Sequence, residues 1–255
     1  MFSKLAALTL SLWFWSVVAV PTAEDSSLER RARASVYSKC TVAKTVALTF
    51  DDGPYVYAYD IVKALDAAGA KGTFFVNGNN YRCIYDEDSV KRVKYVYNHG
   101  HQLASHTWAH KDLTTLSWDN IHDEMWRVEQ ALVRITGAYP AFMRPPYGNY
   151  NNLVLDASGI RGQSVVIWDF DSEDSLGASV ATSENLYKSR ISAKPSSILA
   201  LNHETVETTA HQVLPYAIQR LQAAGYKLVT LAECLGKKPY QSVVAPSTRD
   251  SSWVC

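Results

Sequence analysis

A buried strand and two acidic residues meet in the segment Thr49-Phe50-Asp51-Asp52-Gly53-Pro54. The preceding run, Lys44–Leu48, is β-branched and apolar, which predicts a strand inside the protein. Two carboxylates at the end of such a strand are costly unless a cation or a base partner occupies the site. The Gly-Pro pair then predicts a sharp turn. Because neighbouring strand side chains point in different directions, we expect Asp51 and Asp52 to have different roles, one binding a metal and the other acting as a base.

Length and composition limit the classes of protein that this chain can belong to. Its 255 residues suit one large α/β domain or two small ones. With 25 basic and 25 acidic residues the formal net charge is zero, which argues against nucleic acid or an anionic membrane as a partner. The chain is rich in tryptophan and tyrosine, whose flat faces suit sugar rings, although such residues more often belong to a core.

The N-terminal segment has the pattern of a secretory signal peptide. One lysine precedes Leu5–Val20, an uninterrupted run of apolar and hydroxyl residues, and a charged segment follows. The run is short for a membrane-spanning helix, so we predict a signal peptide over residues 1–20 rather than an anchor. Residues 21–39 then form an N-terminal segment or a short pro-region. We therefore expect a secreted protein, outside the cell or in the cell wall.

Secretion predicts disulfides among the four cysteines, which are Cys40, Cys83, Cys234 and Cys255. Four cysteines allow three pairings, and the residues alone do not choose among them. We expect the main domain to span residues 40–240. The tail at 241–255 is polar and lacks the hydrophobic stretch that a lipid-anchor signal requires.

Short strands alternate with helices along the rest of the chain. We expect strands at 73–76, 101–104, 141–143, 164–168, 197–201 and 227–231, and helices at 58–69, 89–98, 117–137 and 210–224. This alternation implies parallel pairing, in a barrel or an open doubly wound sheet. Ligands bind at the carboxyl ends of the strands in both architectures, and each polar cluster below follows a strand. The pattern therefore favours a barrel with one functional rim.

Two histidines in Ser105–His110 are candidate metal ligands. His106 and His110 are four residues apart, which places them on one face of a helical turn. With Asp52 they would form a His, His, carboxylate set that leaves coordination positions for water or substrate. Alone, the pair is weak evidence, because two unrelated surface histidines are the simpler explanation. Together with the aspartate pair, it favours a metal site.

Three further clusters follow predicted strands. In Arg144–Gly148 two prolines remove backbone donors, so the Tyr147 amide can point outward, and the arginine suits a carboxylate; an ordinary rigid surface loop is the alternative. Residues 169–174 hold four carboxylates, which we expect to be mostly solvated or to cap the next helix. His203 follows the buried run 198–202, and taken alone it is a satisfied core histidine.

Together these segments resemble the five ordered motifs of the polysaccharide deacetylases, carbohydrate esterase family four, which contain a NodB homology domain. The matching segments are Thr49–Pro54, Ser105–His110, Arg144–Gly148, Asp171–Asp174 and Leu201–His203. Within the family the chain is most similar to secreted fungal chitin deacetylases, also through Phe75–Asn80. The resemblance spans about Cys40 to Gly236, and five motifs in the same order make it highly specific.

The resemblance implies a distorted (β/α)7 barrel and a metal-dependent amidohydrolase. Asp51 would be the general base, and Asp52, His106 and His110 would hold one divalent ion, zinc in the first place or cobalt. Many members carry an aromatic residue where this chain has Ser175. We expect that difference to alter the shape of the substrate groove and not the chemistry.

The same resemblance implies roles for the remaining motif residues. Arg144 would hold Asp51, and the Tyr147 amide would face the oxyanion. His203 would be the general acid, steadied by Asp174, with Leu201 against the acetyl methyl group. The family pairing would join Cys40 to Cys234 and leave Cys83 to pair with Cys255.

The implied activity is removal of N-acetyl groups from the N-acetylglucosamine units of chitin or chitooligosaccharides, which gives acetate and glucosamine units. We expect a monomer with chitin as its partner, without nucleic acid and without a membrane anchor. Within hydrolases, an acetyl xylan esterase or a peptidoglycan deacetylase is the alternative. From another class, a catalytically silent chitin-binding protein remains an alternative.

Overall fold

The structure is a computed structural model that describes residues 33–255. The predicted signal peptide, residues 1–20, lies outside the described residues, as does most of the segment 21–39. The strands are β1 (Val36–Tyr37), β2 (Thr45–Gly53), β3 (Gly72–Val76), β4 (Gln102–Ser105), β5 (Ala138–Pro140), β6 (Phe142–Met143), β7 (Ser164–Val166), β8 (Phe170–Asp171), β9 (Ile198–His203), β10 (Lys227–Leu228) and β11 (Tyr240–Val243).

Seven α-helices and four short helical turns connect the strands within the described residues. The helices are α1 (Ala58–Ala67), α2 (Glu87–Asn98), α3 (Trp118–Thr136), α4 (Asn152–Ile160), α5 (Val180–Ser192), α6 (Leu214–Ala223) and α7 (Leu231–Leu235). The turns are η1 (Leu113–Thr115), η2 (Pro146–Gly148), η3 (Asp174–Leu176) and η4 (Thr209–Val213).

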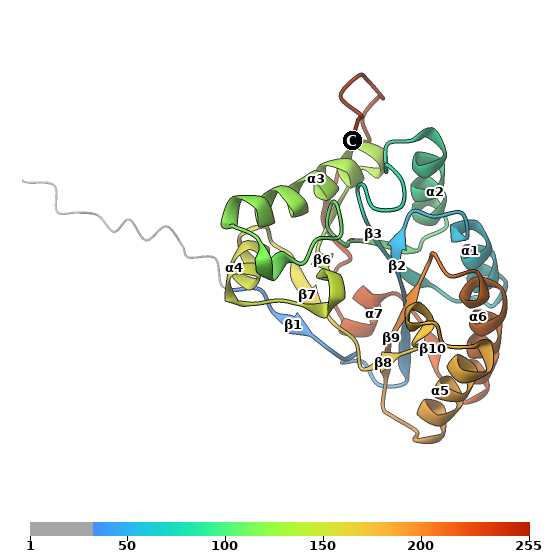
Figure 1. The fold of residues 1–255 in the computed structure, drawn as a ribbon. Coiled ribbons are helices and arrows are strands. Elements are labelled where there is room, and N and C mark those ends of the chain that lie inside the picture. The colour runs from blue at the N-terminus through green and yellow to red at the C-terminus, as the bar shows by residue number, and fades with distance from the viewer. Residues whose placement is uncertain (1–32) are drawn as a thin grey trace, which may run out of the picture. The chain divides into compact units, whose positions relative to one another are not determined.

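The main sheet is parallel throughout and confirms the predicted α/β barrel class. Its strands run in the order β1-β7-β6-β4-β3-β2-β9-β8, and β10 also pairs with β2. The sheet curls into a half-barrel, with α1, α2, α5 and α6 along one side and α3 and α4 along the other (Figure 1). Because every pair is parallel, the carboxyl ends of the strands meet at one rim.

β2 is the central strand of the sheet, with a neighbouring strand on each side and buried side chains along its length. Val46, Leu48 and Phe50 have no exposed surface, and the strand pairs with β3 on one side and with β9 on the other. The strand is longer than the predicted run and extends to Gly53. Asp51 and Asp52 are therefore its last side chains before the rim.

The helices follow the predicted hydrophobic spacing where one face is apolar. In α3 the apolar face packs into the core, the Ser117 side chain accepts the Asn120 N–H, and Gly137 ends the helix at φ 80°. The predicted helix 210–224 begins instead with the π-turn η4. The predicted last strand ends early, because Thr230 and Glu233 form a capping box that starts α7.

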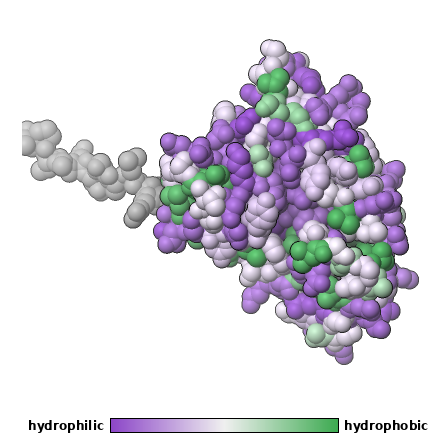
Figure 2. Space-filling model, in the orientation of Figure 1, coloured by the Kyte–Doolittle hydropathy of each residue, from purple (hydrophilic) through white to green (hydrophobic). Residues whose placement is uncertain are grey.

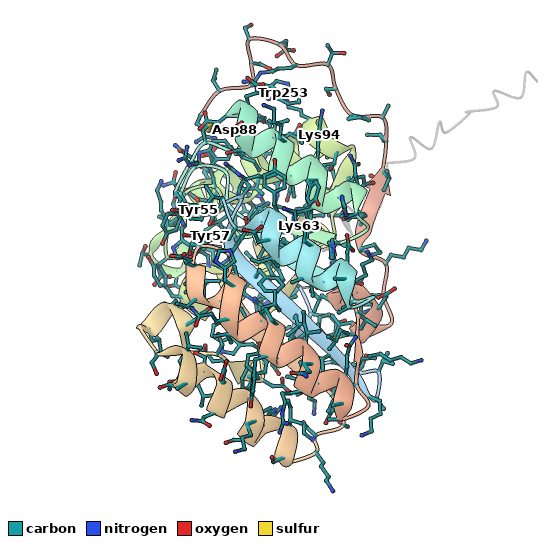
Figure 3. All side chains as sticks on the ribbon, turned by 90° about the vertical axis from the view of Figure 1, so that its right-hand side faces the viewer. Tyr55, Tyr57, Lys63, Asp88, Lys94 and Trp253 are labelled. Carbon is teal, nitrogen blue, oxygen red and sulfur yellow. A yellow bond between two sulfur atoms is a disulfide. The ribbon has the colours of Figure 1, made fainter. Side chains whose placement is uncertain are left out.

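The segments on either side of residues 40–240 pack onto the domain within the described residues. Arg33 makes an ion pair with Asp156 at 2.8 Å. At the other end, β11 pairs with β5 in an antiparallel ribbon, and Trp253 packs against Tyr85 with ring centroids 5.5 Å apart. Figure 3 shows the tail carrying Trp253 beyond α2, on which Asp88 and Lys94 are labelled, while Lys63 lies on α1.

Two disulfides close long loops, and no cysteine is free. Cys40 is joined to Cys234, and Cys83 to Cys255, which is the pairing that the resemblance implied. Each helix within residues 33–255 is too short or too polar to cross a membrane. On the face seen in Figure 2, apolar residues form small separate groups among hydrophilic ones.

Candidate active site

Asp51 and Asp52 approach the same histidine ring, whereas strand alternation predicted different directions. The pairing of β2 with β3 shifts register between Asp51 and Gly53, and Asp52 has φ 70°. This irregularity turns Asp52 inward, as β-bulges commonly do next to active sites. Its Oδ1 lies 3.6 Å from His106 Nε2, and Asp51 Oδ2 lies 3.7 Å from the same atom.

The two histidines come from an irregular loop after β4, so the predicted helical turn is wrong. Thr107 and His110 both have positive φ, at 70° and 53°. The loop nevertheless turns both rings to one side, with centroids 4.9 Å apart. These positive φ values exclude a helical turn, and the carbonyls of His106 and Thr107 accept hydrogen bonds from the side chain of Asn77.

Asp52, His106 and His110 offer three ligand atoms that lie within 4.8 Å of one another. His110 Nε2 is 3.4 Å from Asp52 Oδ1. His106 Nδ1 donates to the Arg144 carbonyl at 2.8 Å, which leaves Nε2 as the free lone pair. Burial, followed by the neighbouring His106, lowers the pKa of His110 and favours the neutral ring that binds metals. This donor set fits a divalent ion with open positions, as in catalytic zinc sites.

Arg144 is fully buried beneath the site and holds Asp51. Its Nη1 donates to Asp51 Oδ1 and to Thr49 Oγ1, each at 2.7 Å. Its Nη2 donates to the Ile167 carbonyl at 3.1 Å, and the guanidinium lies 4.2 Å from the Phe75 ring centroid. These contacts fix Asp51 by one oxygen and leave its Oδ2 facing His106. The alternative of an exposed arginine on a surface loop is therefore wrong.

Most carboxylates of residues 169–174 have specific partners, and none of them caps α5, which Ser179 caps instead. Asp169 bonds Arg190 at 2.7 Å. Asp174 is buried because η3 turns it toward β9. The expectation of a mostly solvated acidic loop is therefore wrong at these two residues.

Asp174 and His203 form a buried pair. Asp174 Oδ1 accepts from His203 Nδ1 at 2.7 Å, and its Oδ2 accepts the His203 backbone N–H at 2.8 Å and the Thr209 hydroxyl at 2.7 Å. Burial opposes a charged ring, but the hydrogen bond and charge of Asp174 outweigh it and raise the pKa of His203 to about 9. His203 is therefore held as a cation at neutral pH, available as a proton donor.

These groups line one cleft of about 440 Å³ at the carboxyl ends of the strands. Leu201, Trp168 and Leu176 provide apolar surface in the cleft. Ser175 also lines it, at the position where many family members carry an aromatic residue. Tyr147 has φ 60° in η2, is 65% exposed and packs its ring against His110 at 4.8 Å. Every predicted site residue is therefore part of this cleft or bonded to a residue that lines it.

Sequence reasoning gave no role to three buried residues around the site: Thr49, Asn77 and Glu204. Glu204 accepts the Tyr55 backbone N–H at 2.5 Å, and burial raises its pKa to about 8. A Cβ on Gly53 would lie 2.7 Å from the Glu204 Cδ atom, which explains the glycine. The sequence signal that could have pointed to Thr49, Asn77 and Glu204 is that each lies in or next to a motif segment. Tyr55 lies in the loop before α1, near Tyr57 (Figure 3).

Comparisons with known proteins identify the family of this chain. The profile of the polysaccharide deacetylase family matches residues 38–164. A chitin deacetylase from Pestalotiopsis is 37% identical over 208 residues, which cover 79% of this chain and 67% of the relative. A probable peptidoglycan-N-acetylglucosamine deacetylase from Arthroderma benhamiae is 38% identical over 205 residues, covering 79% of this chain and 46% of the relative. The chain thus spans from about half to two thirds of the length of these two relatives.

Solved structures agree as well. The chitin deacetylase from the fungal pathogen Colletotrichum lindemuthianum superposes with a TM-score of 0.78 at 30% identity, covering 82% of this chain and 94% of that one. A curated chitin deacetylase from the same species is 33% identical, and the match covers 83% of its length. The chain belongs to the polysaccharide deacetylase family.

Proposed function

We propose that this protein hydrolyses the N-acetyl groups of N-acetylglucosamine units in chitin or chitooligosaccharides, giving acetate and glucosamine units. One observation carries the proposal. Three side chains that could hold a metal ion, a carboxylate held by an arginine and a histidine held by an aspartate all face one cleft. Related chitin deacetylases at 33% and 37% identity supply the substrate class.

The ligand set suits Zn²⁺ best, with Co²⁺ as the alternative. When bound, such an ion lowers the pKa of a coordinated water toward about 7 and polarises a carbonyl. Asp51 is placed to accept the proton of the attacking water as general base. Arg144 holds its other oxygen, which fixes the orientation of the proposed base.

His203 then protonates the leaving amine as general acid. Asp174 keeps the ring charged and fixes its orientation through Nδ1, so that Nε2 remains for the substrate. The Tyr147 N–H follows two residues without amide donors and would stabilise the oxyanion, a contact typically worth roughly 3–4 kcal/mol. Leu201 would contact the acetyl methyl group. The overall hydrolysis is balanced, because water supplies the hydroxyl of acetate and the proton of the free amine.

Peptidoglycan is the second candidate substrate, because a relative from Arthroderma benhamiae that is 38% identical is named a probable peptidoglycan-N-acetylglucosamine deacetylase. The same cleft could accept an O-acetyl ester of xylan. A silent chitin-binding protein is less well supported, because each catalytic position holds a competent side chain in bonding contact with its partner.

We also propose that the protein is secreted, acts outside the cell or in the cell wall, and works as a monomer. The two disulfides support an oxidising compartment.

Mass spectrometry of the products from defined chitin oligomers, acetylated xylan and peptidoglycan fragments tests the proposal. We expect mass losses of one acetyl group per reacted unit, fastest on chitin oligomers and dependent on added zinc. Faster release from xylan or peptidoglycan would reassign the substrate. Binding of chitin oligomers without any mass loss would establish the silent binding protein instead.

A further inference from the structure

Asn77 lies directly after β3 and beneath the loop that carries both histidine ligands. Its side chain is buried, with 1% of its surface exposed. The Nδ2 group donates to the His106 carbonyl at 2.5 Å and to the Thr107 carbonyl at 3.1 Å. One side chain therefore binds the two peptide carbonyls that flank Thr107, directly after the first proposed ligand.

Those two carbonyls need a partner because the loop leaves regular structure at this point. The His106 N–H still donates to the Val76 carbonyl at 2.8 Å, as in a parallel ladder. Thr107 then takes φ 70°, which turns the chain out of the strand. A buried carbonyl without a donor is destabilising, so the Asn77 amide stabilises this conformation at the His106 carbonyl and, together with the Gly78 N–H at 3.3 Å, at the Thr107 carbonyl.

A second amide holds Asn77 in place. Asn80 Nδ2 donates to Asn77 Oδ1 at 3.2 Å and lies 3.5 Å from Asp52 Oδ1. The backbone of the intervening residues adds to the contact, since Gly78 and Asn79 both donate to the Trp108 carbonyl, at 3.0 and 2.6 Å. The segment 77–80 thus contacts Asp52, the backbone of His106 and the backbone of Thr107 and Trp108 between the two histidines.

We propose that Asn77 is a positioning residue for the metal site, which sets the distance between the two histidine ligands and Asp52 through its two backbone hydrogen bonds. The inference rests on the proposed metal site. Outer groups that orient metal ligands typically change metal affinity by 10- to 100-fold when they are replaced.

The Asn77→Asp variant separates this role from simple packing. Aspartate has nearly the same shape but cannot donate to the two carbonyls. It also adds negative charge near the ion, which by itself strengthens cation binding. A weaker affinity would therefore measure the loss of ligand geometry and not a change of charge.

Asn202→Asp is the matched control. Asn202 is also buried, and its Nδ2 donates to the Thr49 carbonyl at 3.3 Å, but it does not contact the histidine loop. Asn80→Ala is the second variant, because Asn80 is exposed and its replacement leaves the core intact.

Zn²⁺ is titrated into the metal-free full-length chains by isothermal calorimetry, and the Tm of each metal-free chain is recorded. We expect a 10- to 100-fold higher Kd for Asn77→Asp, a smaller increase for Asn80→Ala and no increase for Asn202→Asp. Unchanged affinity in both Asn77→Asp and Asn80→Ala overturns the inference, and Asn80→Ala alone decides if Asn77→Asp does not fold. Failure of the wild-type chain to bind zinc would instead contradict the proposed function.

Discussion

The orientation of each key residue in this site depends on one hydrogen-bonded partner. Asp51 is oriented by Arg144, His106 by the Arg144 carbonyl, and His203 by Asp174. Arg144 thus contacts two site residues, through its side chain the proposed base Asp51 and through its carbonyl the proposed metal ligand His106. Replacing a partner is therefore expected to change the chemistry of the residue that it holds, even where the partner does not touch the substrate.

Asp174→Asn tests the partner of the general acid. The wild-type ring donates a proton only while charged, so kcat/KM should fall as pH rises through its pKa of about 9. Without the aspartate charge, burial dominates, and this basic limb should move to the ordinary value of 6.5 or below. The measurement is the pH profile of acetate release. An unmoved basic limb would contradict the assignment of His203 as general acid.

Arg144→Ala tests the buried ion pair. Removing the arginine leaves Asp51 buried without its cation, which typically costs roughly 3–5 kcal/mol of unfolding free energy. The control is Arg33→Ala, whose ion pair with Asp156 is exposed to solvent and should contribute far less to stability. Urea unfolding of the two metal-free variants compares them. Equal small losses would show that the buried pair does not support the fold.

Among the elements, the strands β2, β3 and β9 and the helices α1, α2, α3 and α6 were predicted, whereas α4, α5, α7 and the conformations of the loops at the site were not. The apolar run before Thr49 and the spacing of α3 follow from periodicity, which depends on burial alone. The turn at Asp52 and the loop from His106 to His110 adopt positive φ without glycine. Such conformations are held by contacts from distant segments, in this case from Asn77, so the residues at the site could be named but their conformations could not.

The acidic segment before α5 shows the same limit. A local pattern of four carboxylates predicts solvation, and Asp174 is buried only because His203 and Thr209 arrive from β9 and η4. The predicted role of Asp174 came from the resemblance to the family and not from the local sequence pattern.

The loop after β3 is tied to the C-terminal tail by a disulfide, and the double variant Cys83→Ser, Cys255→Ser tests that connection. The bond joins residues 172 positions apart, for which the loop-entropy model gives about 5 kcal/mol, often less in practice. We expect a loss of 2–5 kcal/mol in unfolding free energy and faster hydrogen exchange in residues 244–255, with β2 and β9 still protected. Unchanged exchange in the tail would show that Trp253 packing alone holds it.

Across the whole molecule, the parallel sheet brings five distant segments to one rim. The proposed ligands and acid–base residues span from Asp51 to His203 along the chain, and they line a single cleft because each lies at the carboxyl end of a parallel strand or just after it. The disulfide between Cys40 and Cys234 joins the two ends of this domain. The fold thus accounts for how one site is assembled from residues that are remote in sequence.

Acetate release from a chitin oligomer, measured as zinc is added back to the exhaustively chelated full-length chain, tests the claim that these segments share one catalytic cation. We expect no release without metal and a linear rise that saturates at one zinc per chain. Full release after complete chelation would contradict it.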